Sequence, residues 1–135
     1  MSELTIVDIY CRVATSEPGS NSLDKQEAAC RAYCIEHDLT IDMIFREVAA
    51  ASQYHNRKYL TKLRERYKTG QTQGVVVTTL DRLSRSQVHL VILMGEMEQH
   101  DITLYLVKES INSTALGNLV RMLLVFVADL EREKA

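Results

Sequence analysis

The sequence predicts an α/β fold in which a mainly parallel central sheet is flanked by helices. Four short segments are rich in apolar and β-branched residues, as strands are: residues 4–11, 40–46, 75–79 and 102–107. Longer segments with the apolar spacing of helices follow them, at 22–37, 57–68, 87–100 and 114–134. A regular alternation of strand and helix is typical of parallel strands joined through helices, so we expect one open sheet with helices packed on it.

The composition fits a single globular domain. The chain has 135 residues, of which 46% are hydrophobic and 25% charged, so it is large enough for a proper core. We expect residues 1–135 to form one domain. Because the sequence has no run of about 18 apolar residues and no charged-then-apolar leader, we expect neither a membrane span nor a secretory signal. Three cysteines, an odd number, indicate free thiols in the reducing cytoplasm.

The first strand and helix are predicted from apolar content and from helix-start signals. Leu4–Cys11 is the first strand, and Pro18 with Gly19 marks the loop after it. Ser22 fits the N-cap of a helix that runs to about His37. The apolar face of this helix is formed by four residues: Leu23, Cys30, Tyr33 and Cys34.

The next elements are a second strand and a strongly charged helix. Thr40–Arg46 is the strand, and residues 47–56 are predicted as an irregular loop. Arg57–Lys68 is the helix, and Gly70 stands where a C-terminal cap is expected. The run from Val75 to Thr79 then predicts a strand buried on both faces.

Two helices and one strand complete the prediction. Residues 87–100 form the first of these helices, with five candidate core residues: Val88, Val91, Ile92, Met94 and Met97. Ile102–Val107 is the last strand. Thr114–Lys134 is a long helix that is apolar over more of its circumference than one packed layer needs. It is either a surface helix that frays or an oligomerisation helix cut short at Ala135, and we favour the second because its apolar stripe would otherwise be exposed.

A cluster of charges directly follows the buried strand, in Asp81-Arg82-Leu83-Ser84-Arg85. Ligands of open α/β sheets bind beyond the carboxyl ends of the strands. Two guanidinium groups three residues apart could grip one phosphate there, although the pattern also fits an ordinary helix start with surface arginines. The net charge of −2 argues against autonomous, high-affinity binding of nucleic acid by this chain alone.

A second motif changes the weight of these alternatives. Tyr10-Cys11-Arg12-Val13-Ala14-Thr15 follows the first strand, and Ser22-Leu23-Asp24-Lys25-Gln26 opens the first helix. Together with the Asp81–Arg85 motif, they resemble the catalytic domain of the serine recombinases, the family of resolvases, invertases and large serine integrases. The resemblance runs from Tyr10 to Arg132. It implies strand exchange in DNA through a 5′-phosphoserine intermediate, in a tetramer and without a cofactor or metal.

The resemblance also assigns expected roles to individual residues. Arg12, Arg57, Arg82 and Arg85 match the family's active-site arginines, Asp81 its positioning acid, and Gln26 the glutamine that orients the active-site loop. Further positions are expected in the oligomer interface or around the site: Tyr10, Ser22, Leu123, Glu131 and Arg132. The implied partners are DNA, contacted by the full-length protein, and further copies of the chain, from dimer to tetramer. The implied location is the cytoplasm. The implied source of the gene is a bacterium, a phage or another mobile element.

One position departs from the family pattern where it matters most. The family has its nucleophilic serine where this chain has Ala14, and a methyl group cannot attack phosphorus. We expect the chain to be unable to cleave DNA, through deliberate replacement of the serine or as a natural inactive relative, and we favour replacement. In addition, Thr79 stands where many members have a lysine.

Other functions remain open on the sequence alone. A non-catalytic assembly module with the recombinase fold is favoured by Ala14, but it has no evident use for the arginine set. A flavodoxin-like or Rossmann small-molecule-binding domain fits the strand–helix alternation but lacks a glycine-rich phosphate loop. Cys30, Cys34 and His37 have a spacing that could place three zinc ligands on one helix face; without a fourth ligand we predict core thiols instead.

Overall fold

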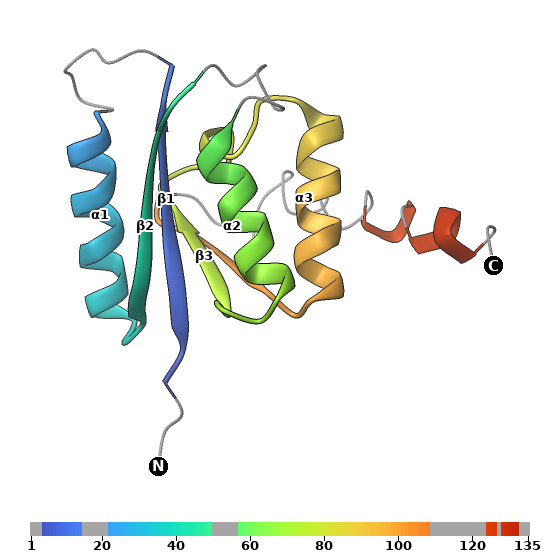
Figure 1. Ribbon diagram of the computed structural model, residues 1–135, viewed down its shortest axis with the longest axis horizontal. Coiled ribbons are helices and arrows are strands. Elements are labelled where there is room, and N and C mark those ends of the chain that lie inside the picture. Colours follow the sequence, from blue (N-terminus) through green and yellow to red (C-terminus); the bar gives the residue numbers. More distant parts are fainter. Residues whose placement is uncertain (1–3, 15–21, 50–56, 109–123, 127, 133–135) are drawn as a thin grey trace.

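A computed structural model describes residues 4–14, 22–49, 57–108, 124–126 and 128–132. Within these residues lies a four-stranded, parallel sheet in the order β2-β1-β3-β4. The strands are β1 (Ile6–Val13), β2 (Thr40–Val48), β3 (Gly74–Val77) and β4 (Thr103–Leu106). The helices are α1 (Leu23–Glu36), α2 (Lys58–Lys68) and α3 (Gln87–Gln99), with a short 3₁₀ turn, η2 (Leu80–Arg82), after β3. The predicted α/β architecture with a parallel sheet is confirmed (Figure 1).

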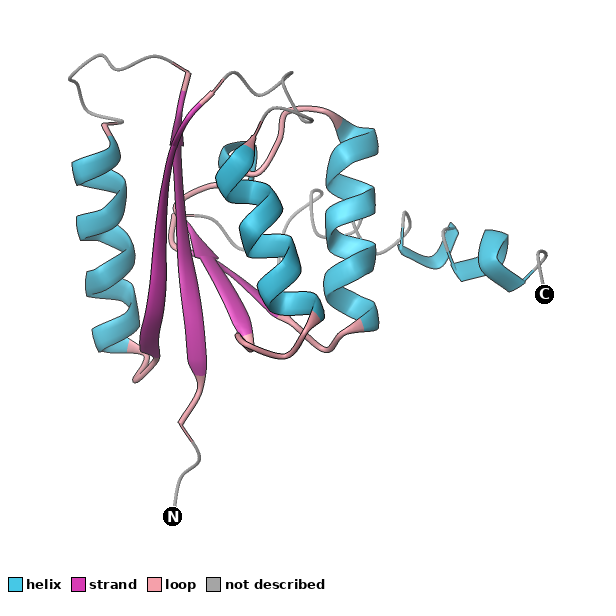
Figure 2. Cartoon of the chain, viewed as in Figure 1, coloured by secondary structure: helices cyan, strands magenta, loops and turns pink. Residues whose placement is uncertain are grey.

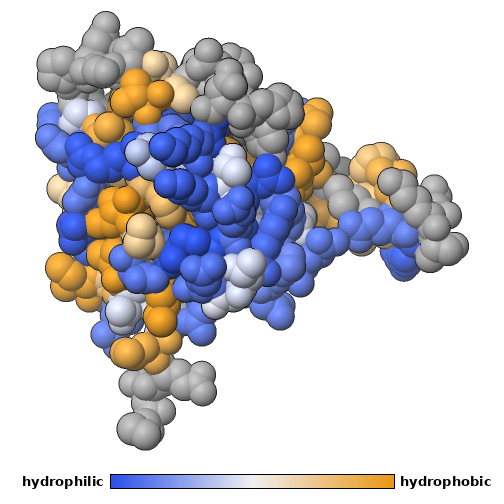
Figure 3. All heavy atoms as spheres, viewed as in Figure 1, coloured by the Kyte–Doolittle hydropathy of each residue, from blue (hydrophilic) through white to orange (hydrophobic). Residues whose placement is uncertain are grey.

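The helices divide between the two faces of the sheet (Figures 1 and 2). α1 packs on one face, and α2 and α3 pack on the other around the larger of two core clusters. Because side chains alternate along a strand, Tyr10 of β1 faces α2 whereas Cys11 faces α1. Figure 3 shows hydrophilic side chains over most of α2, and hydrophobic ones over the sheet between α1 and α2, where Met43 of the edge strand β2 is 41% exposed.

The three cysteines are free thiols in the core, as predicted for Cys30 and Cys34. Cys11 of β1 and the two thiols of α1, Cys30 and Cys34, are fully buried between β1 and α1. A hydrogen bond with Cys11 and burial raise the pKa of the Cys30 thiol, so this thiol stays protonated. His37 stacks on Tyr33, with 4.0 Å between the ring centroids. Across the described part of the chain, no group of three histidine, cysteine, aspartate or glutamate side chains is arranged to hold a metal ion.

The predicted ends of three strands are wrong. β1 continues through Arg12 to Val13, two residues beyond the predicted end at Cys11, because these residues pair with the end of β2. β2 continues through Glu47 to Val48, in place of the predicted irregular loop, because these residues pair with the end of β1. β3 ends at Val77, so Thr78 and Thr79 belong to the turn that follows. The helix signals were more accurate: the Ser22 hydroxyl caps α1 by accepting from the backbone N–H of Lys25 at 3.3 Å.

The predicted core face of α3 is only partly correct. Met94 and Met97 are buried, but Val88 and Ile92 are 68% and 42% exposed. Leu93, which the spacing does not single out, is fully buried. α3 carries apolar residues around most of its circumference, so the spacing cannot select the face that packs against α2 and β4.

The predicted helix Thr114–Lys134 lies largely outside the described residues, and so does Leu123. The described residues 124–126 and 128–132 are helical. Leu124 packs against the core on the α2–α3 side, whereas Val125 and Phe126 are 60% and 59% exposed. None of the helices in the described ranges is both long and apolar enough to cross a membrane.

Glu96 of α3 connects α3 to α2 through three hydrogen-bond donors. Its carboxylate accepts from Arg64 Nε at 2.9 Å and from the Tyr67 hydroxyl at 2.6 Å, and it lies 2.8 Å from Lys68 Nζ. Burial acts to raise the pKa of Glu96, but hydrogen bonds from these three side chains outweigh it and lower the pKa from 4.5 to about 2. The folded protein therefore holds this carboxylate in its ionised form.

This depressed pKa predicts a loss of stability in acid. Ionised Glu96 stabilises the fold above pH 4.5, and its contribution is lost as the pH falls toward 2. Glu96→Gln should therefore lower the free energy of unfolding by about 2 kcal/mol more near pH 6 than near pH 3, as measured by urea denaturation. A difference between the two proteins that does not change with pH would contradict this assignment.

Candidate active site

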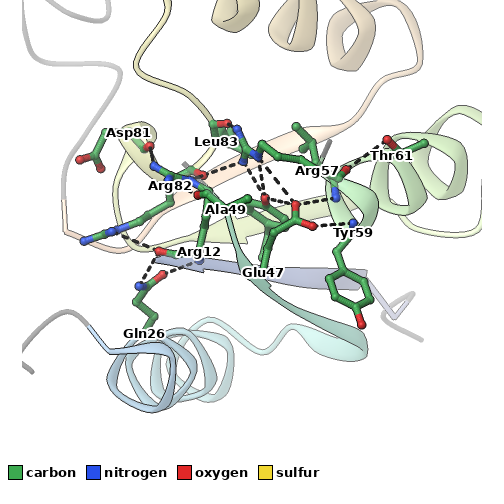
Figure 4. Close-up of polar contacts among 12 residues, drawn as sticks. Arg12, Gln26, Glu47, Ala49, Arg57, Tyr59, Thr61, Asp81, Arg82 and Leu83 are labelled. Atoms are coloured by element: carbon green, nitrogen blue, oxygen red, sulfur yellow. Dashed lines mark hydrogen bonds and ion pairs between the residues drawn. The ribbon is translucent and has the colours of Figure 1, made fainter. Parts of the chain in front are cut away.

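The carboxyl ends of β1, β2 and β3 meet at one edge of the sheet, here called the carboxyl edge (Figure 4). β3 leads there into the Asp81 turn, which comprises residues 80–83. Open parallel sheets usually bind their ligands at this edge. Hydrogen bonds bring five predicted site residues together at it: Arg12, Gln26, Arg57, Asp81 and Arg82.

Arg12 connects β1 to two other segments of the carboxyl edge. Its side chain is buried, with the residue 3% exposed. The guanidinium donates to three main-chain carbonyls: Nε to Arg82 at 2.9 Å, Nη1 to Ala49 at 2.9 Å and Nη2 to Asp81 at 2.8 Å. Burial, followed by the charge of Arg57, lowers the pKa of Arg12. Arg12 therefore holds the Asp81 turn against the ends of β1 and β2.

The main chain of Arg12 is itself fixed from two sides. Gln26 of α1 accepts from the Arg12 N–H at 3.0 Å and donates to the Arg12 carbonyl at 2.9 Å. Nη1 of Arg82 donates to the same carbonyl at 3.1 Å. Arg12 and Arg82 thus each bind the other's main chain. Nε of Arg82 is buried without a hydrogen-bond partner in the described part of the chain.

Arg57 holds the Asp81 turn from the α2 side. It occupies the N-cap position of α2 and is fully buried. Nη1 donates to the Leu83 carbonyl and Nη2 to the Arg82 carbonyl at 3.0 Å. Nε and Nη2 both donate to the Tyr10 hydroxyl, at 3.1 and 2.6 Å. The Arg57 guanidinium also lies 5.3 Å from the centroid of the Tyr10 ring.

Glu47 is an acidic partner of Tyr10 and Arg57 that the sequence did not reveal. It is 3% exposed and lies near the end of β2. Its Oε1 accepts from the Tyr10 hydroxyl at 2.7 Å and lies 3.7 Å from Arg57 Nε. Burial is the main reason that the pKa of Tyr10 is raised, so Tyr10 keeps its proton. A usable signal existed: Glu47 is two residues after the apolar Phe45 and so faces the same core if the strand continues.

Asp81 and Arg85 form an exposed pair at the rim of the site. Arg85 Nη2 lies 3.9 Å from Asp81 Oδ2, and the two side chains are 74% and 43% exposed. The Thr79 hydroxyl donates a hydrogen bond to Asp81 Oδ1. Thr79 therefore orients the Asp81 carboxylate from the position where many members of the family have a lysine. Arg85 is the predicted site arginine whose side chain is largely accessible to a ligand.

Ala14 lies directly after β1, at the carboxyl edge. It is exposed, two positions after the fixed main chain of Arg12. Its methyl group supplies no nucleophile. Residues 15–21, which include Ser16 and Ser20, lie outside the described residues. Ser22 acts as the N-cap of α1.

The remaining predicted interface residues lie apart from the cluster. Glu131 accepts from Gln99 Nε2 at 3.0 Å, at the end of α3 that is remote from the Asp81 turn. Arg132 pairs with Asp129. The structure therefore does not bring Glu131 or Arg132 to the carboxyl edge.

Comparison with known proteins identifies the family. The model of the resolvase N-terminal domain matches residues 7–135. A DNA-invertase of Enterobacteria phage P7 is 33% identical over 125 residues, which are 92% of this chain and 61% of that protein. The Tn552 transposon resolvase of Staphylococcus aureus is 32% identical over 126 residues, which are 91% of this chain and 58% of that protein. The chain thus spans about three fifths of the length of these relatives.

Solved structures support the same conclusion. The N-terminal catalytic domain of TP901-1 integrase superposes with a TM-score of 0.76 and 27% identity, over 96% of this chain and 98% of that one. A resolvase family site-specific recombinase from Streptococcus pneumoniae shares the fold, with a TM-score of 0.70 and 22% identity over 96% of this chain and 89% of that one. By sequence and by fold, the chain belongs to the serine recombinase family, of which it carries the resolvase N-terminal domain.

Proposed function

We propose that residues 1–135 form the catalytic domain of a site-specific DNA recombinase whose cleavage step is disabled by Ala14. The observation that carries the proposal is the interlocked pair of Arg12 and Arg82 at the carboxyl edge, directly beside position 14. Four arginines lie at this edge with two carboxylates, Glu47 and Asp81, which leaves an excess of positive charge in a chain with a net charge of −2. Such an excess suits a phosphodiester.

The proposed reaction needs a serine hydroxyl where this chain has a methyl group. The serine Oγ attacks phosphorus and loses its proton, the bond from phosphorus to the 3′ oxygen breaks, and that oxygen leaves as a free 3′ hydroxyl. The product is a 5′-phosphoserine ester, which keeps the bond energy for rejoining and needs no added cofactor. Phosphoryl transfer of this kind depends mainly on positioning and on stabilising the charge around phosphorus.

The contacts of the arginines indicate different roles for them in the proposed reaction. Every guanidinium nitrogen of Arg12 and Arg57 already donates to a main-chain carbonyl or, in Arg57, to the Tyr10 hydroxyl, so in this arrangement the two residues shape the site and supply buried positive charge. Arg85, at the rim, reaches a phosphate without breaking a buried contact. Asp81 pairs with Arg85 at the rim, and we expect its carboxylate to assist proton transfer.

DNA binding and strand exchange require more than this domain. Its net charge of −2 implies that other parts of the full-length protein supply most of the contacts to DNA. Four copies are proposed to cut two sites together. The apolar helix expected at 114–134 is the proposed interface between copies.

This interface makes a prediction about self-association. The described end of the helix exposes Val125 and Phe126, at 60% and 59%, which a second copy would cover. Leu123→Asp should place a charge in that interface and shift the protein toward the monomer in analytical ultracentrifugation. Ile35→Asp, which places the same charge at an 82% exposed apolar residue of α1 outside the proposed interface, is the matched control. A wild-type protein that is strictly monomeric at high concentration would contradict the proposed interface.

A non-catalytic assembly protein is the second candidate, and Ala14 is the observation that favours it. The two functions differ in what happens when the hydroxyl is supplied. The test offers cognate DNA to the Ala14→Ser protein, extended through its own C-terminal sequence. A covalent protein–DNA adduct supports the recombinase; specific binding without an adduct supports the assembly protein.

A further inference from the structure

Glu47 stands at the start of a chain of hydrogen bonds that ends on the Asp81 turn (Figure 4). We propose that Glu47 is a positioning residue: it orients Tyr10, Tyr10 orients Arg57, and Arg57 fixes the turn that carries Arg82 and Arg85. This role rests on the proposed function of the site, because the turn matters for chemistry only if it binds a phosphodiester.

The first step is the anchoring of the Glu47 carboxylate. Oε2 accepts from the backbone N–H of Tyr59 at 2.8 Å, and Oε1 accepts from the backbone N–H of Leu60 at 3.1 Å. These are donors of the first turn of α2, which has no side-chain cap of its own at Arg57. Because Glu47 also belongs to β2, its carboxylate is held between a strand and a helix N-terminus. Its position is therefore fixed without any help from the Asp81 turn.

The second step sets the direction of the Tyr10 hydroxyl. A hydroxyl has one proton, and that of Tyr10 is donated to Glu47 Oε1 at 2.7 Å. The lone pairs of the hydroxyl are consequently turned toward Arg57, from which they accept two hydrogen bonds, at 3.1 and 2.6 Å. A carboxylate, which only accepts, enforces this direction; a neutral amide at position 47 does not.

In the third step, the oriented Arg57 side chain fixes the main chain of the Asp81 turn. With Nε engaged by Tyr10, the guanidinium plane of Arg57 directs Nη1 to the Leu83 carbonyl and Nη2 to the Arg82 carbonyl. The Arg82 carbonyl also accepts from Arg12 Nε at 2.9 Å. The main chain of the turn is thus clamped between two buried arginines, and one of them is oriented through Glu47. Glu47 itself is 3% exposed and makes none of the contacts expected to reach DNA.

The first arm of the test uses the chain as it is, with Ala14, and so does not depend on catalysis. Glu47→Gln keeps the size of the side chain but removes the charge that directs the Tyr10 proton. The Nε–Hε signal of Arg57 in ¹⁵N NMR spectra should shift and exchange faster with water, and the backbone signals of residues 81–83 should shift with it. Glu96→Gln, which removes another hydrogen-bonded carboxylate, should leave these signals in place. Unchanged Arg57 and turn signals in Glu47→Gln would overturn the proposal.

The second arm tests whether the orientation that Glu47 gives to Arg57 and the Asp81 turn affects the rate of the reaction. In the extended Ala14→Ser protein, Glu47→Gln should slow adduct formation by about 100-fold, while the affinity for DNA and its salt dependence stay unchanged. Glu96→Gln in the same background controls for loss of stability and should react at the parent rate. An unchanged rate in Glu47→Gln, with adduct formed by the parent, would overturn the role of Glu47 but leave the recombinase function standing.

A second variant covers the case in which Glu47→Gln does not fold. Tyr10→Phe keeps the Glu47 contacts to α2 and removes only the hydroxyl that relays its effect to Arg57. The same NMR and rate changes are expected of it. If neither parent nor variants form an adduct, while the NMR arm behaves as expected, the proposed function fails and the hydrogen-bond chain stands as a structural feature. Normal rates and unchanged Arg57 signals in Tyr10→Phe would overturn the proposal.

Discussion

The Ala14→Ser protein should become covalently attached to DNA, whereas the Ala14 protein should form no such adduct. Position 14 directly follows β1, and the main chain two residues earlier is fixed by Gln26 and by Arg82. The place of the new hydroxyl is therefore set by the strand and not by the side chain that it replaces. Ala14 is exposed, so the added oxygen meets no packed core.

The measurement is an adduct that survives denaturing electrophoresis and moves with a labelled 5′ end of the cut strand. Arg82→Ala in the Ala14→Ser background is the matched variant, and it should reduce adduct formation by about 100-fold or more because it removes charge stabilisation at phosphorus. An adduct in the Ala14 protein itself would show that another residue is the nucleophile. Undiminished reaction in Arg82→Ala would show that the charge cluster is misassigned.

The architecture was predictable because its signals are local. The Val75–Val77 run has to be a buried strand, and the Ser22 hydroxyl can cap α1 using only neighbouring residues. The order of strands and helices then limits the sheet to a parallel arrangement. The exposed Val88 and Ile92 show where local signals fail. When a helix is apolar around most of its circumference, the spacing of its residues does not predict which face is buried.

The partners of the site residues were not predictable because they depend on contacts distant in sequence. The sequence predicts a loop at Glu47, because the alternation after Phe45 has meaning only if the strand continues, and nothing nearby shows that β2 pairs with β1 as far as Val48. The arginines were expected to face a phosphate, yet Arg12 and Arg57 donate to carbonyls at residues 49 and 81–83. A sequence shows that a charged side chain is present. Only the fold shows whether its hydrogen-bond partner is solvent, a ligand or the main chain.

Arg57→Met should cause the largest loss of stability among single substitutions at the site. Methionine fills a similar volume but donates no hydrogen bonds, so the carbonyls of Arg82 and Leu83 lose a buried donor. Glu47, which is 3% exposed, also loses the cation 3.7 Å away. Removing one partner of a buried ion pair typically costs about 3–5 kcal/mol, a large part of the stability of a domain of this size.

The size of this loss can be separated from a general effect of removing an arginine. Arg85→Met removes the same charge from a side chain that is 74% exposed, and urea denaturation should show a change within about 0.5 kcal/mol. Adding Glu47→Gln to Arg57→Met should recover part of the loss, because the buried carboxylate left without its cation is then neutral. If Arg57→Met costs no more than Arg85→Met, the buried network does not stabilise the Asp81 turn, and the arginine at position 57 is instead held ready for the DNA.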